Sequence, residues 1–230
     1  MLNIRKIIKQ VAISFTILFI LSSCDFKTEQ DYLNDAERLS EQKKYKEAIE
    51  LLDKAIKKNP KYLGAYINRG ADKSALGYFE EAIKDYKTVL QIDSKNTLAL
   101  YNIGNNYKRL ENYEKAVEFY NQAFETKGGQ NIYLDLTQND FFGINEYDVP
   151  GYEIFYERGI AYYSMDSLQR ALEDINASLH QNYMIADCYF WLGFIYLSTG
   201  QTDLGCENLK KSKQLGNKDA EIELKKYCNE

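Results

Sequence analysis

The sequence predicts an all-α solenoid of about five helix-turn-helix repeats, with one inserted loop and a C-terminal capping helix. Two series of small residues predict it. The first recurs in a 34-residue frame, at Ala36, Gly70, Gly104, Gly159 and Gly193. The second follows twelve positions later, at Ala48, Ala82, Ala116, Ala171 and Gly205. Small side chains let the two helices of a hairpin cross closely, and stacked hairpins bury their apolar faces against one another.

Helical periodicity is the third observation. Apolar and charged residues alternate at helical spacing in segments 45–58 and 113–124, as expected for amphipathic helices. The chain holds 20 Tyr among 230 residues and only 2 Pro. We therefore expect most tyrosine rings to pack between helices as part of a continuous core.

The chain begins with a segment that does not fit the frame. Arg5, Lys6 and Lys9 precede an apolar run over residues 11–21, about half of the ~20 residues that a membrane-spanning helix needs. This order of charge, apolar run and small residues is typical of a secretory signal. The ending, Leu21 to Cys24, resembles the bacterial lipoprotein signal, which implies that Cys24 is lipidated and becomes the new N-terminus. The alternative is an uncleaved N-terminal anchor with an incidental cysteine.

These boundaries divide the chain into six parts. We predict a lipoprotein signal peptide over 1–23, a lipidated tether over 24–30 and repeats 1–3 over 31–127. An insertion follows over 128–151, then repeats 4–5 over 152–216 and a capping helix over 217–230. The expected location is the bacterial cell envelope, with the repeats facing the periplasm or the cell exterior. Asp25 after the lipidated cysteine does not decide between the inner and the outer membrane.

The residues around the small positions resemble the tetratricopeptide repeat family. Segments 63–93, 99–124 and 152–179 carry most of the pattern. A leucine or an aromatic residue follows the first small residue by three positions, at Leu39, Tyr107, Tyr162 and Tyr196, and Lys73 departs from this rule. Four positions after the second small residue come Leu52, Tyr86, Tyr120, Ile175 and Leu209. The resemblance implies that the first helix of each repeat lines a concave face that binds a protein partner.

The insertion lies where one interval of the frame is 55 residues instead of 34. Glycine and proline punctuate it and helical periodicity disappears. Its apolar residues, among them Phe141, Phe142 and Tyr147, are costly to leave in water. Two interpretations stay open: a long ordered loop packed on neighbouring helices, or a partner-binding surface, since long loops in compact folds are often functional.

Three cysteines remain after the lipidated one. Cys206 lies on the second helix of the last repeat and Cys228 at the end of the final helix. If that helix folds back as a cap, the two thiols come close enough for a disulfide in an exported protein. The alternative is that all three thiols are free or buried. We expect Cys188 to be a small core residue.

Composition argues against several functional classes. The formal net charge is −5, and removing the leader takes away three positive charges and no negative ones, so the mature chain is near −8. An acidic chain without a basic stripe is a poor candidate for binding nucleic acid. One histidine and no closely paired cysteines make a metal site improbable. We expect no metal and no cofactor.

The expected binding residues lie on the concave face. They are Asn68, Tyr101, Asn102, Asn105, Lys108, Tyr156, Tyr163, Phe190 and Phe194. Each could equally serve packing between repeats. In peptide-binding relatives, asparagines on this face hold an extended backbone and basic residues hold a terminal carboxylate. The first repeat offers Leu33 and Glu37 instead, so an internal peptide or a helix fits better than a chain terminus.

The sequence nominates no catalytic group. It has no serine elbow, no HExxH motif and no phosphate loop, and the helical pattern predicts that its carboxylates fall on outward faces. We therefore expect a lipid-anchored interaction scaffold rather than an enzyme. A passive structural spacer of the envelope is the alternative, and an enzyme or a glycan-binding lipoprotein is the least favoured class.

Overall fold

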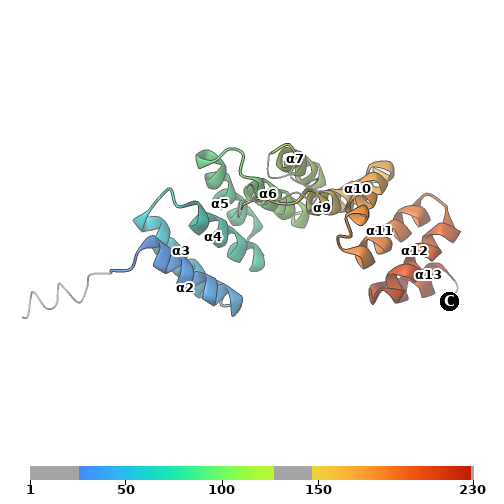
Figure 1. Cartoon of the computed structure of the whole chain (residues 1–230), viewed down its shortest axis with the longest axis horizontal. Helices are drawn as coiled ribbons and strands as arrows, with labels where there is room; N and C mark the ends of the chain where they lie inside the picture. The colour runs from blue at the N-terminus through green and yellow to red at the C-terminus, as the bar shows by residue number, and fades with distance from the viewer. Residues whose placement is uncertain (1–25, 127–146, 229–230) are drawn as a thin grey trace, which may run out of the picture.

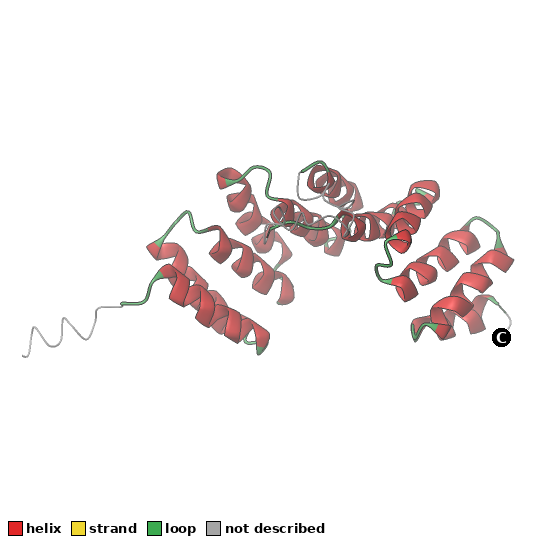
Figure 2. Cartoon of the chain, in the orientation of Figure 1, coloured by secondary structure: helices red, strands yellow, loops and turns green. Residues whose placement is uncertain are grey.

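The computed structural model describes residues 26–126 and 147–228. The predicted signal peptide, Cys24 and most of the insertion lie outside these residues. The described chain is entirely helical, without strands (Figure 2). Within it, no helix is long and apolar enough to cross a membrane.

The helices form five antiparallel pairs followed by a single helix. The pairs are α2 (Glu29–Glu41) with α3 (Tyr45–Lys58), α4 (Leu63–Ala75) with α5 (Phe79–Ile92), α6 (Thr97–Arg109) with α7 (Tyr113–Phe124), α9 (Gly151–Ser164) with α10 (Leu168–His180), and α11 (Ile185–Ser198) with α12 (Thr202–Gln214). The last helix, α13 (Asp219–Tyr227), packs against α12. The pairs stack in chain order into an arch (Figure 1). The structure therefore confirms the all-α solenoid with its capping helix.

The first helix begins slightly before residue 30, the predicted end of the tether. Thr28 accepts a hydrogen bond from the backbone amide of Asp31, and the Asp31 carboxylate accepts one from the Thr28 amide. This reciprocal capping box satisfies two amides that a helix start otherwise leaves unpaired. As a result α2 starts at Glu29, inside the segment that we expected to be a tether.

Small residues allow the helices of each pair to cross closely. A Cβ added at Gly104 would lie 2.6 Å from the Tyr120 ring, and one at Gly70 would lie 2.8 Å from the Tyr86 ring. Ile175 and Leu209 occupy the same space opposite Gly159 and Gly193. The residue four positions after the second small residue thus fills the volume that the first one leaves empty.

The turns inside the pairs share one backbone conformation. Seven positions after each first small residue the chain is left-handed, with φ between 56° and 83°, at Lys43, Gly77, Glu111, Asp166 and Gly200. The next amide donates to the carbonyl of the last helical turn, as Tyr78 does to Lys73 at 2.9 Å and Gln201 to Tyr196 at 2.9 Å. This closing bond is that of a Schellman motif. The frame therefore fixes the turns as well as the helices.

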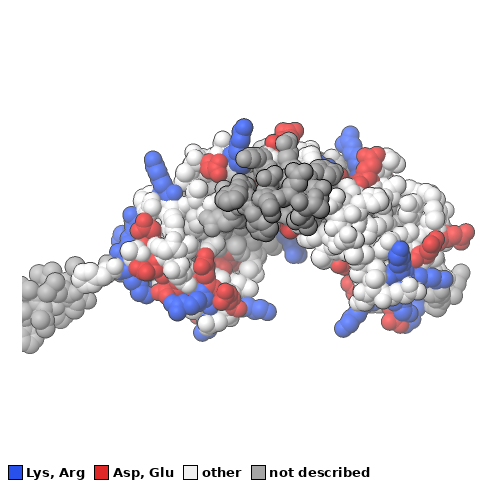
Figure 3. Space-filling model, in the orientation of Figure 1, with Lys and Arg blue, Asp and Glu red and all other residues white. Residues whose placement is uncertain are grey.

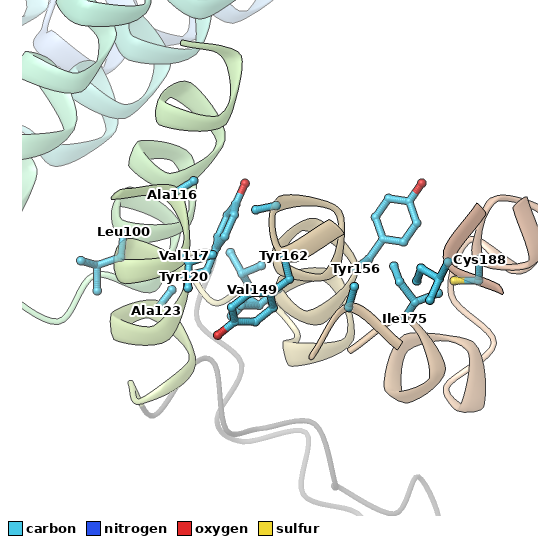
Figure 4. Close-up of a cluster of buried hydrophobic side chains, with 14 of the residues drawn as sticks. Leu100, Ala116, Val117, Tyr120, Ala123, Val149, Tyr156, Tyr162, Ile175 and Cys188 are labelled. Carbon is cyan, nitrogen blue, oxygen red and sulfur yellow. The ribbon is translucent and has the colours of Figure 1, made fainter. Parts of the chain in front are cut away.

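The insertion leaves the stack continuous. Helix α9 packs directly on α7 and α6, and one buried cluster runs from Leu100 through Tyr120 and Tyr162 to Cys188 (Figure 4). The described end of the insertion turns back toward earlier repeats. The Tyr147 carbonyl accepts a hydrogen bond from the Leu98 amide at 2.9 Å, and its ring packs on the cluster of α4, α5 and α6.

The crossing at Gly104 predicts a measurable cost of added volume. Gly104→Ala should lower the free energy of unfolding by about 1 to 3 kcal/mol, because the new methyl group meets the Tyr120 ring. Urea denaturation measures this. The control is the double variant Gly104→Ala/Tyr120→Leu, which copies the first repeat, where Ala36 and Leu52 hold these two positions and are both fully buried. Its loss should be smaller than the sum of the single losses, and strict additivity would contradict the crossing argument.

Candidate functional site

The first helices of the pairs form the inner side of the arch. Each contacts the first helix of the next pair, from α2 to α4, α6, α9 and α11. In Figure 1, α6 and α9 lie on the inner side and α7 and α10 on the outer side. Because the site expected from the sequence lies on the first helices, this inner face is the candidate functional site.

The end of the inner face near α2 is polar and hollow. A hollow of about 300 Å³ lies between α2 and α4, lined by Glu37, Ser40, Glu41, Asn68, Ala71 and Asp72. Asn68 Nδ2 donates to Glu37 Oε1 at 3.0 Å, and the Ser40 hydroxyl donates to Asp72 Oδ2 at 2.9 Å. Asn68 is thus on the inner face as predicted, with its amide engaged by a neighbouring repeat.

Asp72 is unusual among the residues that line this hollow, because its carboxylate is buried. The residue is 4% exposed. Burial raises the pKa of Asp72 from 3.8 to about 6, and the hydrogen bond from Ser40 opposes this only in part. The next repeat places Asn106 two positions after its glycine, as Asp72 is, and Ser74 donates to it at 2.7 Å. The same frame position thus holds an acid in one repeat and its amide in the next.

In the middle of the inner face, most of the predicted binding groups contact other residues of the protein. Asn105 Oδ1 accepts from the Tyr120 hydroxyl at 2.7 Å, and the Tyr101 ring lies 6.0 Å from the Tyr120 ring. Lys108 forms an ion pair with Glu157 of α9.

Asn102 is half-buried beside these residues, and its backbone carbonyl accepts from Asn106 Nδ2 at 2.7 Å. The middle of the inner face therefore ties α6 to its neighbours more than it presents free groups to a partner.

Two predictions about this region are wrong. Tyr156 was expected to line the groove, yet it is 9% exposed, because its ring packs edge-on against Tyr183 at 5.8 Å. Carboxylates were expected on outward faces, yet Glu157 bonds across the inner face and Asp72, Asp85 and Asp174 are buried. Helical periodicity missed these acids because their partners come from other helices.

Aromatic rings cover the inner face at the other end. We define the aromatic belt as Tyr163 of α9, Phe190, Trp191 and Phe194 of α11, and Tyr227 of α13. Neighbouring ring centroids lie 5.5 Å apart for Tyr163 and Trp191, 4.9 Å for Phe190 and Phe194, and 6.3 Å for Phe194 and Tyr227. The first four residues are half-buried and Tyr227 is 42% exposed. The structure therefore brings together three predicted residues, Tyr163, Phe190 and Phe194, and adds two.

A disulfide fixes α13, and with it one edge of the belt. Cys206 of α12 and Cys228 are bonded, with their Cα atoms 5.7 Å apart. Beneath them, Leu224 and Ala220 of α13 cover Leu209, and Phe190 packs against this cluster. Cys188 is a fully buried free thiol.

Sequence reasoning also missed two buried ion pairs. Arg69 grips Asp85 with two nitrogens, at 3.0 and 2.5 Å, and Arg158 grips Asp174 at 2.7 and 2.8 Å. Both arginines directly precede the first small residue, and both aspartates follow the second by three positions. Lys73, the departure from the family pattern, joins Asp85 at 2.7 Å.

Acidic and basic residues are interspersed on the face shown in Figure 3, without a stripe of one sign. In residues 26–126 and 147–228, no group of three or more His, Cys, Asp or Glu side chains could hold a metal ion.

Three segments of the chain match models of tetratricopeptide repeats. Residues 74–111 match a model described as a TPR repeat, and residues 97–127 and 186–219 match models described as a tetratricopeptide repeat. These matches fall on helices of the second, third and fifth pairs.

Two known proteins resemble parts of the chain. Sperm-associated antigen 1 of Rattus norvegicus is 39% identical over 93 residues, which are 40% of this chain and 10% of that protein. Hsp70-Hsp90 organizing protein 1 of Glycine max is 30% identical over 111 residues, 48% of this chain and 19% of that protein. The chain thus covers no more than about a fifth of the length of either relative.

A solved structure covers most of the chain. YrrB, described as a TPR protein with an unusual peptide-binding site, aligns with a TM-score of 0.63 at 20% identity, over 85% of this chain and 91% of that one. At this identity the likeness shows the fold alone.

The buried carboxylate predicts a pH-dependent stability. The pKa of Asp72 is higher in the folded chain than in the unfolded one, so the unfolded state releases the proton first and the free energy of unfolding falls as the pH rises from 4 to 6. Asp72→Asn keeps the acceptor for Ser40 and removes the buried charge. It should therefore raise the free energy of unfolding by about 1 to 3 kcal/mol at pH 7.5 and change it little at pH 4.

Urea denaturation at the two pH values tests this prediction. The matched control is Asn106→Asp, which places an acid at the same position of the next repeat and should destabilise the chain at pH 7.5. An equal effect of Asp72→Asn at both pH values would show that the charge of Asp72 does not matter.

Proposed function

Because this chain is a tetratricopeptide repeat protein, we propose that it is an interaction scaffold whose inner face binds a peptide or a helix of a partner protein. The aromatic belt is the observation that carries this proposal. The rings of Tyr163, Phe190, Trp191 and Phe194 stay only half-buried on the inner face, although burying an aromatic side chain is favourable. A partner that covers the belt completes that burial, and aromatic anchors of this kind dominate the energy of many interfaces.

The relatives support the same class of function. One is named for organizing Hsp70 and Hsp90, and another for a peptide-binding site. Neither name decides the partner of this chain. In the described part of the chain, the inner face offers packing surface, amides and carboxylates, which suit binding better than chemical conversion of a substrate.

We further propose that a lipid on Cys24 anchors the scaffold to a membrane of the bacterial cell envelope. The support is the order of basic leader, short apolar run and Leu-Ser-Ser-Cys at residues 21–24. Helix α2 begins at Glu29, so only a few residues separate the anchor from the first repeat. The short spacing would keep the repeats next to the membrane surface, facing the periplasm or the cell exterior.

The scaffold proposal predicts contacts on one side of the arch only. A photo-reactive amino acid in place of Tyr163, on the inner face, should give discrete protein adducts in the native cell. The same amino acid in place of Glu173, an exposed residue on α10 of the same repeat, should give none. Gel electrophoresis with mass spectrometry measures both. The proposal fails if neither position gives adducts or if both give the same ones.

The lipid anchor predicts a processing step that can be blocked. Inhibiting lipoprotein signal peptidase should leave a heavier precursor, because the leader stays attached. Cys24→Ser should remove the lipid label and shift the protein from the membrane fraction to the soluble fraction, provided that another protease removes the leader. The matched control is Cys188→Ser, which leaves the proposed lipidation site intact. Unchanged migration under the inhibitor would refute the anchor.

A further inference from the structure

The aromatic belt includes the one side of helix α11 that the rest of the protein does not fully cover. Helix α11 is apolar on nearly every side, with the sequence IADCYFWLGFIYLS. A helix of this composition is normally surrounded by protein. Cys188, Leu192 and Ile195 of α11 are indeed buried, whereas Phe190, Trp191 and Phe194 are only half-buried. The exposed side of α11 therefore has the composition of an interface.

Carboxylates lie beside the belt. Glu153 and Glu157 stand one turn apart on α9, and Asp187 stands in the first turn of α11. Lys108 neutralises Glu157, and Asn217 donates to Asp187 at 2.9 Å. In the described part of the chain, no lysine or arginine pairs with Glu153. Burial and the negative charge of Glu157 both raise the pKa of Glu153, as expected for a carboxylate without a cationic partner.

Tyrosines join these carboxylates to the belt. The Tyr183 ring lies 5.2 Å from the Tyr152 ring and 5.8 Å from the Tyr156 ring. Burial and the nearby charge of Glu153 raise the pKa of the Tyr183 hydroxyl. Tyr156 in turn lies beside Trp191 of the belt. Tyr183 thus interacts with the Glu153 carboxylate and packs on the buried Tyr156, which in turn neighbours the rings of α11.

The inner face is acidic at its other end as well. Glu37, Glu41 and Asp72 line the hollow between α2 and α4. In the middle of the inner face, the charge of Lys108 is already neutralised by Glu157. A partner segment with a negative charge would meet repulsion at both ends. A segment with a positive charge would find a complementary potential.

We propose that the aromatic belt and Glu153 together bind a segment of a partner protein that carries a lysine or an arginine close to bulky apolar side chains. The apolar side chains pack on Phe190, Trp191 and Phe194, and the cation pairs with Glu153, where the surrounding tyrosine rings add a cation–π attraction. This inference rests on the proposed scaffold function and names the chemistry of the partner.

Selection of peptides by the full chain tests the inference. The probe is a displayed library of random short peptides, followed by fluorescence anisotropy with the strongest binder. We expect selected peptides to combine a basic residue with neighbouring bulky apolar residues. Phe194→Ala should weaken binding about tenfold or more, as expected for an aromatic anchor. Glu153→Gln should weaken it about threefold to tenfold, as expected for loss of one charge pair.

Two controls separate binding from folding. Leu204→Ala removes an exposed apolar side chain on α12, 42% exposed and outside the belt, and should leave the affinity unchanged. Glu153→Lys should reject the selected peptide and bind a version whose basic residue is replaced by glutamate. Circular dichroism verifies that each variant keeps its helices, and the peptide replacements need no change of the protein.

The outcomes distinguish the inference from the function that it rests on. Peptides that bind but ignore Phe194→Ala and Glu153→Gln would overturn the inference and leave the scaffold function standing. Selection of acidic peptides would also overturn the inference. If no peptide is selected by the full chain, both the inference and the peptide-binding function fail.

Discussion

The close crossing of the two helices in each pair is the constraint on which the rest of this structure depends. Tyr86 and Tyr120 place their rings where the Cβ atoms of Gly70 and Gly104 would otherwise be. Because each ring packs directly against the backbone at a glycine, the path of the facing helix sets the position of the ring. The register of each pair follows, and with it the face that every other residue of the repeat occupies. The inner face exists because five such crossings repeat in phase.

Polar contacts adapt this common frame to individual repeats. The second and fourth repeats bury an arginine–aspartate pair at the same two positions, Arg69 with Asp85 and Arg158 with Asp174. Such pairs gain little net stability against apolar residues of the same volume, yet losing one partner costs several kcal/mol. They therefore act mainly to fix which helices associate. The third repeat holds Ile103 and Phe119 at these positions and the fifth holds Leu192 and Asn208, so neither repeat can form this pair.

Much of the fold could be predicted from the sequence, because a period of 34 residues leaves few alternatives. The site was less predictable. Tyr163 and Phe194 lie together in one cluster of half-buried rings, whereas Tyr156 is buried because Tyr183, from a loop, covers it. Tyr227 was missed because it reaches the belt only through the packing of α13 on α12, and Trp191 because its ring meets Tyr163 of another helix. The sequence periodicity describes each helix by itself, and these errors all arise where a second helix or a loop decides the exposure.

The contacts that Tyr147, at the end of the insertion, makes with earlier repeats change how the repeats are coupled. In a simple repeat array each unit contacts only its neighbours, so the units can unfold one after another. Here Tyr147, which precedes the fourth repeat, bonds to Leu98 of the third repeat and reaches Gly64 of the second, where an added Cβ would lie 3.8 Å from its hydroxyl. This contact skips a repeat and links opening of the second repeat to the start of the fourth. We therefore expect the middle of the array to open as one cooperative unit, with fraying mainly at the two ends.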